Sequence, residues 1–255
     1  MAFFKIIIPN YNNAGWLPKC LDSVMSQTFR DHRTVVIDDC STDDSRGIIE
    51  RYSVDFIALQ EKRWNGGARN VGIMHEIDSE YTLFLDSDDW FLDANCLQMI
   101  HDRILSEHHP DCVSLSYKCL IGNSLSMQPL IRNTPKELVD SVYVACWTKC
   151  VKTDLVQLFP ENTLMEDVVQ HIKQCDVIRN VWSMVDPVIC WNRNNVNSCS
   201  RVENQNLQNG KWQSSMYRYA ADLMDLELEH DYCERHRQWR LEVVLNNIRN
   251  GVYLQ

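Results

Sequence analysis

Four short apolar segments, separated by helical or turn-forming patterns, constrain the fold of this chain most strongly. They cover residues 3–8, 34–37, 56–59 and 81–85, and Ile, Val, Leu and Phe dominate them. Continuous apolar runs of this length are typical of strands that are buried on both faces of a parallel sheet. Strands that alternate with helices at this pace predict an α/β fold, in which a mostly parallel central sheet is flanked by helices on both faces.

Polar residues follow three of these four predicted strands directly. A turn-forming cluster at residues 9–13 follows the first, Asp38 and Asp39 follow the second, and residues 86–89 follow the fourth. Ligands of open α/β sheets bind at the carboxyl ends of the strands. We therefore expect the three clusters to converge on one crevice.

The fourth cluster holds three carboxylates, Asp86, Asp88 and Asp89, within four positions. Carboxylates packed this closely raise one another's pKa unless a cation lies among them. Mg²⁺ and Mn²⁺ prefer carboxylate oxygens and share their coordination shell with substrate phosphates. The alternative is that Asp88 or Asp89 caps a helix that begins near residue 93. This stretch alone leaves both interpretations open.

Length and missing motifs exclude several classes of protein. A chain of 255 residues accommodates one large α/β domain, with or without a small appendage. The first predicted strand is not followed by G-x-G-x-x-G, and G-x-x-x-x-G-K-[ST] is absent, which excludes dinucleotide-binding and P-loop proteins. Eleven cysteines occur without any C-x-x-C pair, so we expect reduced and mostly buried thiols.

Charge and hydropathy restrict the partners and the location. The formal net charge of −10 argues against a broad surface for nucleic acid or anionic membrane, although residues 234–240 form a basic segment. On a helix, this segment is more often a solvated face. No apolar run approaches the length of about 18 residues that a membrane span needs, and the N-terminal segment does not resemble a signal peptide. We therefore expect a cytoplasmic protein.

Four motifs in order resemble those of the family 2 glycosyltransferases, which have the GT-A fold. They are residues 8–12 (I-P-N-Y-N), 36–43 (V-I-D-D-C-S-T-D), 65–72 (N-G-G-A-R-N-V-G) and 84–89 (F-L-D-S-D-D). Each string alone is a weak signal, but each also follows the element that the family requires. The resemblance implies a GT-A sheet whose first part is a Rossmann-like nucleotide-binding half, and it covers about the first ninety residues.

The resemblance assigns the first two loops to the base of a nucleotide-sugar donor. Tyr11, next to Pro9 in the first loop, is similar to the residue that stacks on the base. Asp39, or Asp38 beside it, would accept a hydrogen bond from a ring N–H. Arg69, in the A-R-N-x-G string, would lie near the base or the diphosphate. If these residues stood alone, a core tyrosine and acids at helix N-termini would be the better interpretation.

The same resemblance makes residues 86–88 the D-x-D motif of the family. Asp86 and Ser87 would contact the donor, with Asp86 close to the ribose and the metal. Asp88 would ligate Mn²⁺ or Mg²⁺, and Asp89 would be a substitute ligand. The ion would neutralise the diphosphate as negative charge develops on the leaving group.

Further motifs in the second half point to the acceptor side. Residues 159–168 resemble the E-D motif at the start of a helix, which makes Asp167 the expected general base and Glu166 an acceptor contact. Trp147 would line the sugar or acceptor pocket, and Arg193 would approach the diphosphate. The alternatives are two acids that complement a helix dipole, a core tryptophan and a surface arginine.

The resemblance predicts an inverting, metal-dependent glycosyltransferase that moves a sugar from a nucleotide-sugar, by default a UDP-sugar, to an acceptor hydroxyl. The acceptor would be a glycan, a lipid-linked sugar or a hydroxymethylated DNA base, and the net charge counts against DNA. The alternatives are an inactive nucleotide-sugar or glycan-binding protein and a sugar nucleotidyltransferase. We expect a GT-A domain at residues 1–205, with a nucleotide-sugar-binding half (1–92) and an acceptor half (93–205), followed by a helical extension at 206–255.

Overall fold

The computed structural model describes residues 1–140, 144–161, 165–196, 198 and 212–250. In these residues one sheet has nine strands in the order β3-β2-β1-β4-β8-β6-β9-β5, with β7 paired to β6. The strands are β1 (Ala2–Asn10), β2 (His32–Asp38), β3 (Asp55–Ala58), β4 (Ser79–Phe84), β5 (Trp90–Phe91), β6 (Cys112–Ile121), β7 (Ser124–Gln128), β8 (Lys149–Lys152) and β9 (Val181–Asn192). The helices are α1 (Leu17–Met25), α2 (Ser45–Ile49), α3 (Trp64–Met74), α4 (Cys96–Ser106), α5 (Pro135–Val139), α6 (Glu166–Val177), α8 (Trp212–Met224) and α9 (Asp231–Asn250).

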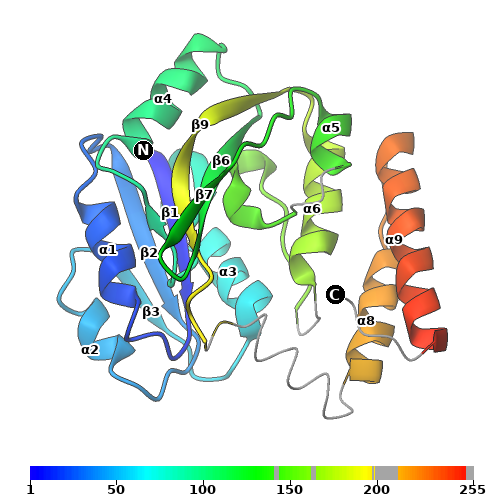
Figure 1. Cartoon of the computed structure of the whole chain (residues 1–255), viewed down its shortest axis with the longest axis horizontal. Coiled ribbons are helices and arrows are strands. Elements are labelled where there is room, and N and C mark those ends of the chain that lie inside the picture. Colours follow the sequence, from blue (N-terminus) through cyan, green and yellow to red (C-terminus); the bar gives the residue numbers. More distant parts are fainter. Residues whose placement is uncertain (141–143, 162–164, 197, 199–211, 251–255) are drawn as a thin grey trace.

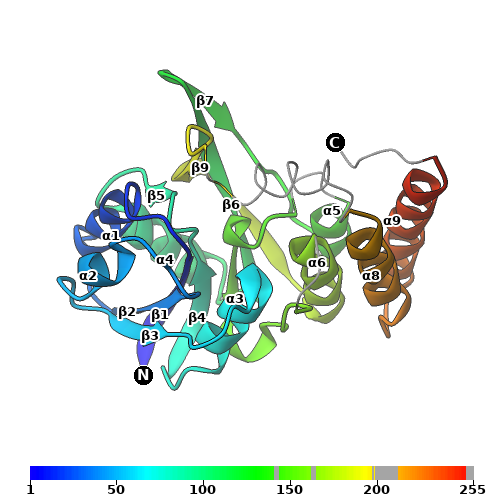
Figure 2. The ribbon, with the colours of Figure 1, turned by 90° about the horizontal axis from the view of Figure 1, so that it is seen from below.

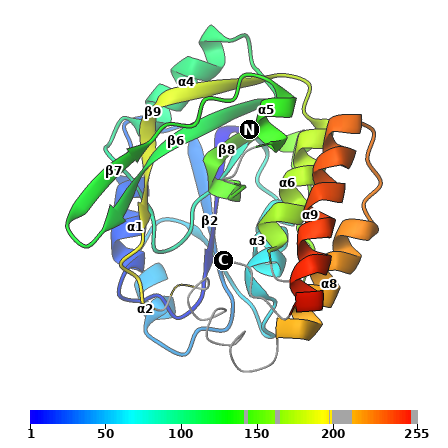
Figure 3. The same cartoon turned by 45° about the vertical axis from the view of Figure 1, so that its right-hand side comes forward.

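The first four strands are parallel, as the alternation of strands and helices predicted. β1 lies between β2 and β4, and β3 pairs with the outer side of β2. Helices α1 and α2 lie on one side of these strands and α3 on the other (Figures 1 and 3). Both faces are therefore covered, which explains why the strands carry continuous apolar runs rather than an alternating pattern.

Beyond β4 the sheet becomes mixed. β8 runs antiparallel to both β4 and β6, β6 runs parallel to β9, and the short β5 runs antiparallel to β9. The predicted sheet with flanking helices is confirmed, and the antiparallel pairs belong to the part of the sheet beyond the four parallel strands. The hairpin of β6 and β7 extends away from the rest of the molecule (Figure 2).

The glycines of residues 65–72 predict a turn that leads into a helix, but in the structure this motif is itself helical. α3 includes all of residues 65–72, so the glycines lie in helical positions where glycine is intrinsically unfavourable. The reason for Gly72 is tertiary packing, because a Cβ there would overlap Cγ2 of Ile7 and lie 2.8 Å from Cδ1 of Ile37. Gly72 therefore lets α3 approach β1 and β2 closely.

We expect Gly72→Ala to destabilise the fold by about 1–3 kcal/mol, because the added methyl group forces Ile7 and Ile37 out of a close-packed core. The measurement is urea denaturation followed by circular dichroism. Gly15→Ala is the matched control, since a Cβ at Gly15 would meet no atom within 4 Å. Equal midpoints for the two variants would contradict this explanation of the motif.

The helix that follows the acidic cluster begins later than expected. α4 starts at Cys96 with Asn95 as its N-cap residue, so neither Asp88 nor Asp89 caps it. The capping interpretation of the acids is therefore wrong. Ser41, three residues before Asp44, predicts a helix that runs to about Tyr52. The helix in the structure, α2, is shorter and runs from Ser45 to Ile49 with Asp44 as its N-cap residue.

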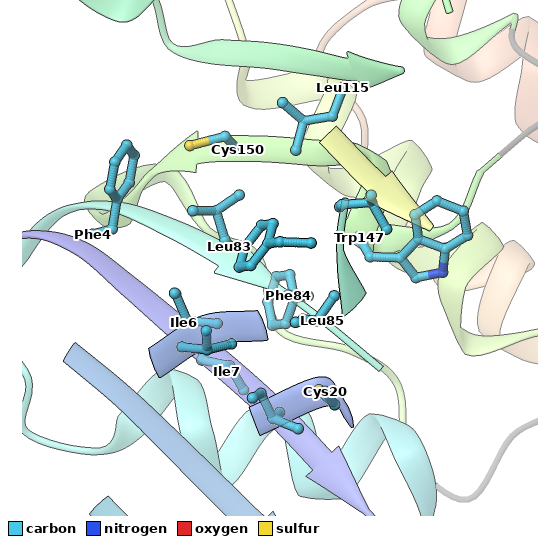
Figure 4. Close-up of a cluster of buried hydrophobic side chains, with 14 of the residues drawn as sticks. Phe4, Ile6, Ile7, Cys20, Leu83, Phe84, Leu85, Leu115, Trp147 and Cys150 are labelled. Carbon is cyan, nitrogen blue, oxygen red and sulfur yellow. The ribbon is translucent and has the colours of Figure 1, made fainter. Parts of the chain in front are cut away.

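Two hydrophobic clusters organise the interior. The first surrounds the parallel strands and includes Ile6, Leu83 and Phe84 (Figure 4). The second lies among α5, α6, α8 and α9 and includes Val168 and Leu223. The two C-terminal helices pack against α5 and α6, on the side away from the parallel strands (Figures 1 and 2). The expected boundary at residues 205 and 206 lies outside the described residues.

The cysteines agree with the expected reduced thiols. In the part of the chain that the structure describes, ten cysteines form no disulfide, and all of them except Cys40 are buried. None of the described helices has both the length and the apolar character that crossing a membrane requires.

Candidate active site

The polar clusters after β1, β2 and β4 lie together, as the strand ends of a parallel sheet require. Asn10, the last residue of β1, donates from Nδ2 to Oδ1 of Asp38 at 2.8 Å. Asn13, in the first loop, donates from Nδ2 to Oγ of Ser87 at 3.0 Å. The three loops are thus joined by side-chain hydrogen bonds into one site.

Asp38 holds the second loop together. Its Oδ1 accepts hydrogen bonds from Asn10 Nδ2 and Ser41 Oγ, and its Oδ2 accepts one from the Ser41 amide at 3.1 Å. Asp38 is buried, and so is Pro9, which pairs with Ile37 inside the sheet. Both oxygens of Asp38 accept hydrogen bonds from neighbouring residues of the site. Contact of Asp38 or Pro9 with the nucleotide base remains a prediction.

Asp39, Lys62 and Tyr11 form the corner where the resemblance places the base. Asp39 Oδ1 accepts a hydrogen bond from the Arg63 amide at 2.6 Å, and Lys62 Nζ lies 3.4 Å from Asp39 Oδ2. The same ammonium lies 2.6 Å from the centroid of the Tyr11 ring, which is 41% exposed. This geometry is a cation–π contact. A base that stacks on this face of Tyr11 would take the place of the ammonium.

Of the three acids in the turn after β4, two are partly exposed and one is buried. The Asp86 side chain is 30% exposed, and Asp88 is partly exposed. Asp89 is 1% exposed, and its Oδ1 accepts a hydrogen bond from the Asn192 amide at 2.8 Å. The internal position gives Asp89 a structural contact with the end of β9, and its role as a substitute metal ligand remains a prediction.

Burial and mutual repulsion change the ionisation of two of these acids. Burial, together with the nearby charge of Asp86, raises the pKa of Asp88 to about 6. Burial, followed by the charges of Asp88 and Asp86, raises the pKa of Asp89 well above its usual range. Such shifts are what carboxylates show when they share a site without a cation.

Arg69 joins the two acidic motifs. It lies in α3 and is 2% exposed. Its Nη2 donates to Asp86 Oδ1 at 2.8 Å, and its Nη1 contacts Glu166 Oε1 at 3.0 Å and Asp167 Oδ1 at 3.4 Å. One buried guanidinium therefore sets the spacing between the D-x-D turn and the first turn of α6, because its planar fork fixes the direction of each hydrogen bond. We call this arrangement the Arg69 cluster.

The expected general base lies in this cluster. Glu166 and Asp167 form the first turn of α6, where their charges also complement the helix dipole. Burial raises the pKa of Asp167, and the charge of Arg69 and a hydrogen bond with the Cys146 thiol oppose that rise. A carboxylate with a raised pKa is a better proton acceptor than an ordinary one. Part of the predicted motif, residues 162–164, lies outside the described residues.

Trp147 has little surface left for a sugar. It lies in the 3₁₀ turn η1 (Cys146–Thr148), is 5% exposed and packs edge-on against Tyr117 with ring centroids 4.9 Å apart. Figure 4 shows it among the buried side chains of the first hydrophobic cluster. This packing favours the core interpretation. Trp191 lies beside it and is partly exposed, with the Arg193 guanidinium 4.9 Å from its ring centroid.

The acids of the D-x-D turn fit a Mn²⁺ or Mg²⁺ ion only with help from a substrate. Among the described residues, no three His, Cys, Asp or Glu side chains gather as a preformed metal site. Asp86 and Asp88 nevertheless supply partly exposed carboxylate oxygens, which are hard ligands. Mg²⁺ sites commonly combine one or two carboxylates with substrate phosphates. The residues present therefore fit an ion that is completed by a diphosphate.

Sequence reasoning missed Lys62 and Asn195, and it included Asn13 only as part of the cluster at residues 9–13. Lys62 covers Tyr11, and Asn13 and Asn195 form hydrogen bonds to the D-x-D turn. Lys62 precedes the A-R-N-x-G string, and a lysine between two charged neighbours looks like an ordinary surface residue, so the sequence does not mark it as part of the site. Asn195 follows β9 in a run of asparagines, and that polar run was the only sign available in the sequence.

Comparison with known proteins identifies the family. The model of glycosyl transferase family 2 matches residues 5–148, which is more than half of the chain. This chain belongs to glycosyl transferase family 2. The resemblance in the motifs is thereby confirmed, and so is the predicted class of enzyme, a glycosyltransferase.

Two bacterial proteins are among the curated relatives of this family 2 chain. Poly(ribitol-phosphate) β-N-acetylglucosaminyltransferase TarS of Staphylococcus aureus is 31% identical over 177 residues, which are 64% of this chain and 30% of the relative. Glycosyltransferase GlyA of Streptococcus pneumoniae is 34% identical over 116 residues, 44% of this chain and 16% of the relative. The chain thus spans less than a third of the length of these relatives.

Solved structures show that the fold is that of GT-A family 2 enzymes. S. aureus TarS residues 1–349 in complex with UDP-GlcNAc match with a TM-score of 0.72 and 23% identity, over 98% of this chain and 73% of that one. Mannosyltransferase PcManGT from Pyrobaculum calidifontis, in complex with GDP-Man and Mn²⁺, matches with a TM-score of 0.60 and 16% identity, over 99% and 76%. At these identities the likeness concerns the fold alone.

Proposed function

We propose that this chain transfers a sugar from a UDP-sugar to an acceptor hydroxyl, with inversion at the sugar and with assistance from Mn²⁺ or Mg²⁺. The Arg69 cluster carries this proposal, because one guanidinium contacts both Asp86, the proposed donor-side acid, and Asp167, the proposed base. An inverting transfer needs a leaving diphosphate on one side of the sugar and a carboxylate on the other. A glycan-binding protein without activity would not need such a base.

The roles of the residues follow from this arrangement. Tyr11 and Asp39 bind the base, and Asp88 together with Asp86 would hold the metal ion. The ion, when bound, neutralises negative charge on the leaving diphosphate. Asp167 accepts the proton of the acceptor hydroxyl as that oxygen attacks, and Arg69 holds Asp167 and Glu166 in place. Glu166, which is bonded to Arg69, borders the acceptor.

N-acetylglucosamine is the donor sugar that we favour, by analogy with TarS, whose structure holds UDP-GlcNAc. The acceptor that we propose is a hydroxyl of a glycan or polyol chain, because TarS is named for poly(ribitol phosphate). A DNA acceptor fits poorly with a net charge of −10. We also keep a cytoplasmic location and the division at residue 205 as predictions.

A panel of UDP-sugars and GDP-sugars, with and without Mn²⁺, tests this function. We expect UDP-GlcNAc with Mn²⁺ to raise the melting temperature, since a ligand at about 100 times its Kd stabilises the native state by about 2.7 kcal/mol. Release of UDP in the same samples measures activity. A preference for a GDP-sugar would overturn the choice of uridine as the nucleoside of the donor. The absence of both a thermal shift and UDP release would overturn the proposed glycosyltransferase function.

Asp88→Asn should abolish the Mn²⁺-dependent part of this thermal shift, because it removes a carboxylate ligand. The matched control is Asp78→Asn, at the opposite end of β4, where the side chain is 79% exposed and should not affect the ion. An unchanged Mn²⁺-dependent shift in Asp88→Asn would contradict the proposed ligand.

A further inference from the structure

Asn195 connects the loop after β9 to the D-x-D turn. Its Nδ2 donates to Asp88 Oδ2 at 2.7 Å and to Asn13 Oδ1 at 3.2 Å. Asn13 in turn donates from Nδ2 to Ser87 Oγ at 3.0 Å. Asn195, Asn13 and Ser87 are all more than nine-tenths buried. These side chains form a continuous chain of hydrogen bonds around the proposed metal ligand.

The amide orientations in this chain are mutually consistent. Asn195 Nδ2 faces two acceptors, a carboxylate oxygen and a side-chain carbonyl. If Asn195 were flipped, its carbonyl oxygen would face the Asp88 carboxylate, and no hydrogen bond would form between two acceptors. If Asn13 were flipped, its amino group would face the amino group of Asn195. The network therefore fixes which atom of each amide lies where.

We propose that Asn195 is a positioning residue for metal binding: it caps Oδ2 of Asp88 and so directs the other oxygen of Asp88 toward the ion. This inference rests on the proposed function, in which Asp88 ligates Mn²⁺ or Mg²⁺. Residues that hydrogen-bond to metal-ligating carboxylates fix the ligand's orientation, and their mutation typically lowers metal affinity about 10–100-fold. Asn195 itself does not contact the ion.

The same loop holds the neighbouring acid by a separate bond. The Asn192 amide donates to Asp89 Oδ1 at 2.8 Å, three positions before Asn195. The last residue of β9 therefore contacts Asp89 through its backbone, and the loop after β9 contacts Asp88 through the Asn195 side chain. Because only the side-chain contact reaches Asp88, substitution of Asn195 tests it without removing the backbone contact with Asp89.

Binding of Mn²⁺ to the full chain in the presence of saturating UDP, followed by electron paramagnetic resonance, tests the proposal. We expect Asn195→Ala to weaken Mn²⁺ binding about 10–100-fold, while the Kd for UDP without metal, measured by calorimetry, stays within about twofold of the wild-type value. Asn195→Ser, which is too short to reach Asp88, should behave in the same way. Asn194→Ala is the matched control, because the Asn194 side chain bonds to the backbone of Gly122 at the β6 and β7 hairpin, and it should leave Mn²⁺ binding unchanged.

Several outcomes would overturn the role of Asn195. One is Mn²⁺ binding in Asn195→Ala that stays within twofold of wild type. Another is an equal loss of metal-free UDP affinity, which would indicate general damage to the site. If neither Asn195 variant folds, as judged by circular dichroism, the residue is structural and the proposal fails. If the wild-type protein with UDP binds no Mn²⁺, both the role of Asn195 and the metal dependence in the proposed function fail.

Discussion

Asp167→Asn is expected to lower kcat for sugar transfer about 10²–10⁴-fold, the range that a positioned general base contributes. Asparagine keeps the shape of the side chain but cannot accept the proton of the acceptor hydroxyl. The KM for the nucleotide-sugar should change little, because Asp167 lies in the first turn of α6 and not beside Tyr11 and Asp39, the residues proposed to bind the nucleobase. Initial rates of UDP release with and without acceptor give both parameters.

Glu161→Gln is the control for this substitution. Glu161 lies in the segment before α6 and pairs with Arg63 at 2.8 Å, outside the Arg69 cluster. Its variant should keep kcat within about threefold of wild type, since partly exposed ion pairs contribute little. Full activity of Asp167→Asn would remove Asp167 from the reaction and would leave the metal site as a separate question.

Arg69→Ala is expected to destabilise the protein by about 3 kcal/mol, the lower part of the range for breaking a buried ion pair, because its three acidic partners are partly exposed. Three carboxylates would be left without their common cation. Loss of transfer activity should accompany the loss of stability, since the spacing of Asp86 and Asp167 is no longer fixed. Urea denaturation at pH 7.5 gives the free energy of unfolding.

The difference between Arg69→Ala and wild type should shrink as the pH falls. Without Arg69, repulsion raises the pKa of the remaining acids in the folded state, so the penalty is present at neutral pH and is relieved as they take up protons. Arg63→Ala is the matched control, because its pair with Glu161 is about one-third exposed and should be worth no more than about 1 kcal/mol. Equal unfolding energies for the two variants would contradict the importance of the Arg69 cluster.

The parallel half of the fold could be predicted because its signals are local. A buried run such as residues 3–8 identifies its own strand, and the polar residues that follow it identify the site end of that strand. The antiparallel position of β8 could not be predicted, since Lys149–Lys152 pairs with strands far away in the sequence. The helical state of the glycine motif was missed because packing of Gly72 against Ile7 outweighs its low helix propensity.

The candidate site divides in the same way. The D-x-D and E-D motifs are short strings, so each could be found in the sequence. The partners of Arg69 could not, because it is 97 and 98 positions away from Glu166 and Asp167. Asn195 lies 182 positions from Asn13, and nothing in either neighbourhood indicates their contact. Trp147 could be found in the sequence, but its role could not be decided there, since a tryptophan suits both a sugar pocket and a core. Its packing against Tyr117 favours the core.

The long sequence separation in the Arg69 cluster also affects the order of folding. The first hydrophobic cluster is built largely from the first half of the chain, whereas α6 belongs to the second cluster. Desolvation of a guanidinium that is only 2% exposed is costly unless carboxylates pair with it. Arg69 therefore cannot become fully buried until residues 166 and 167 have been synthesised and have folded against it. Contacts of such separation form late. A chain emerging from the ribosome therefore gains Asp86 and Asp88, the proposed donor-side acids, well before Asp167, the proposed general base.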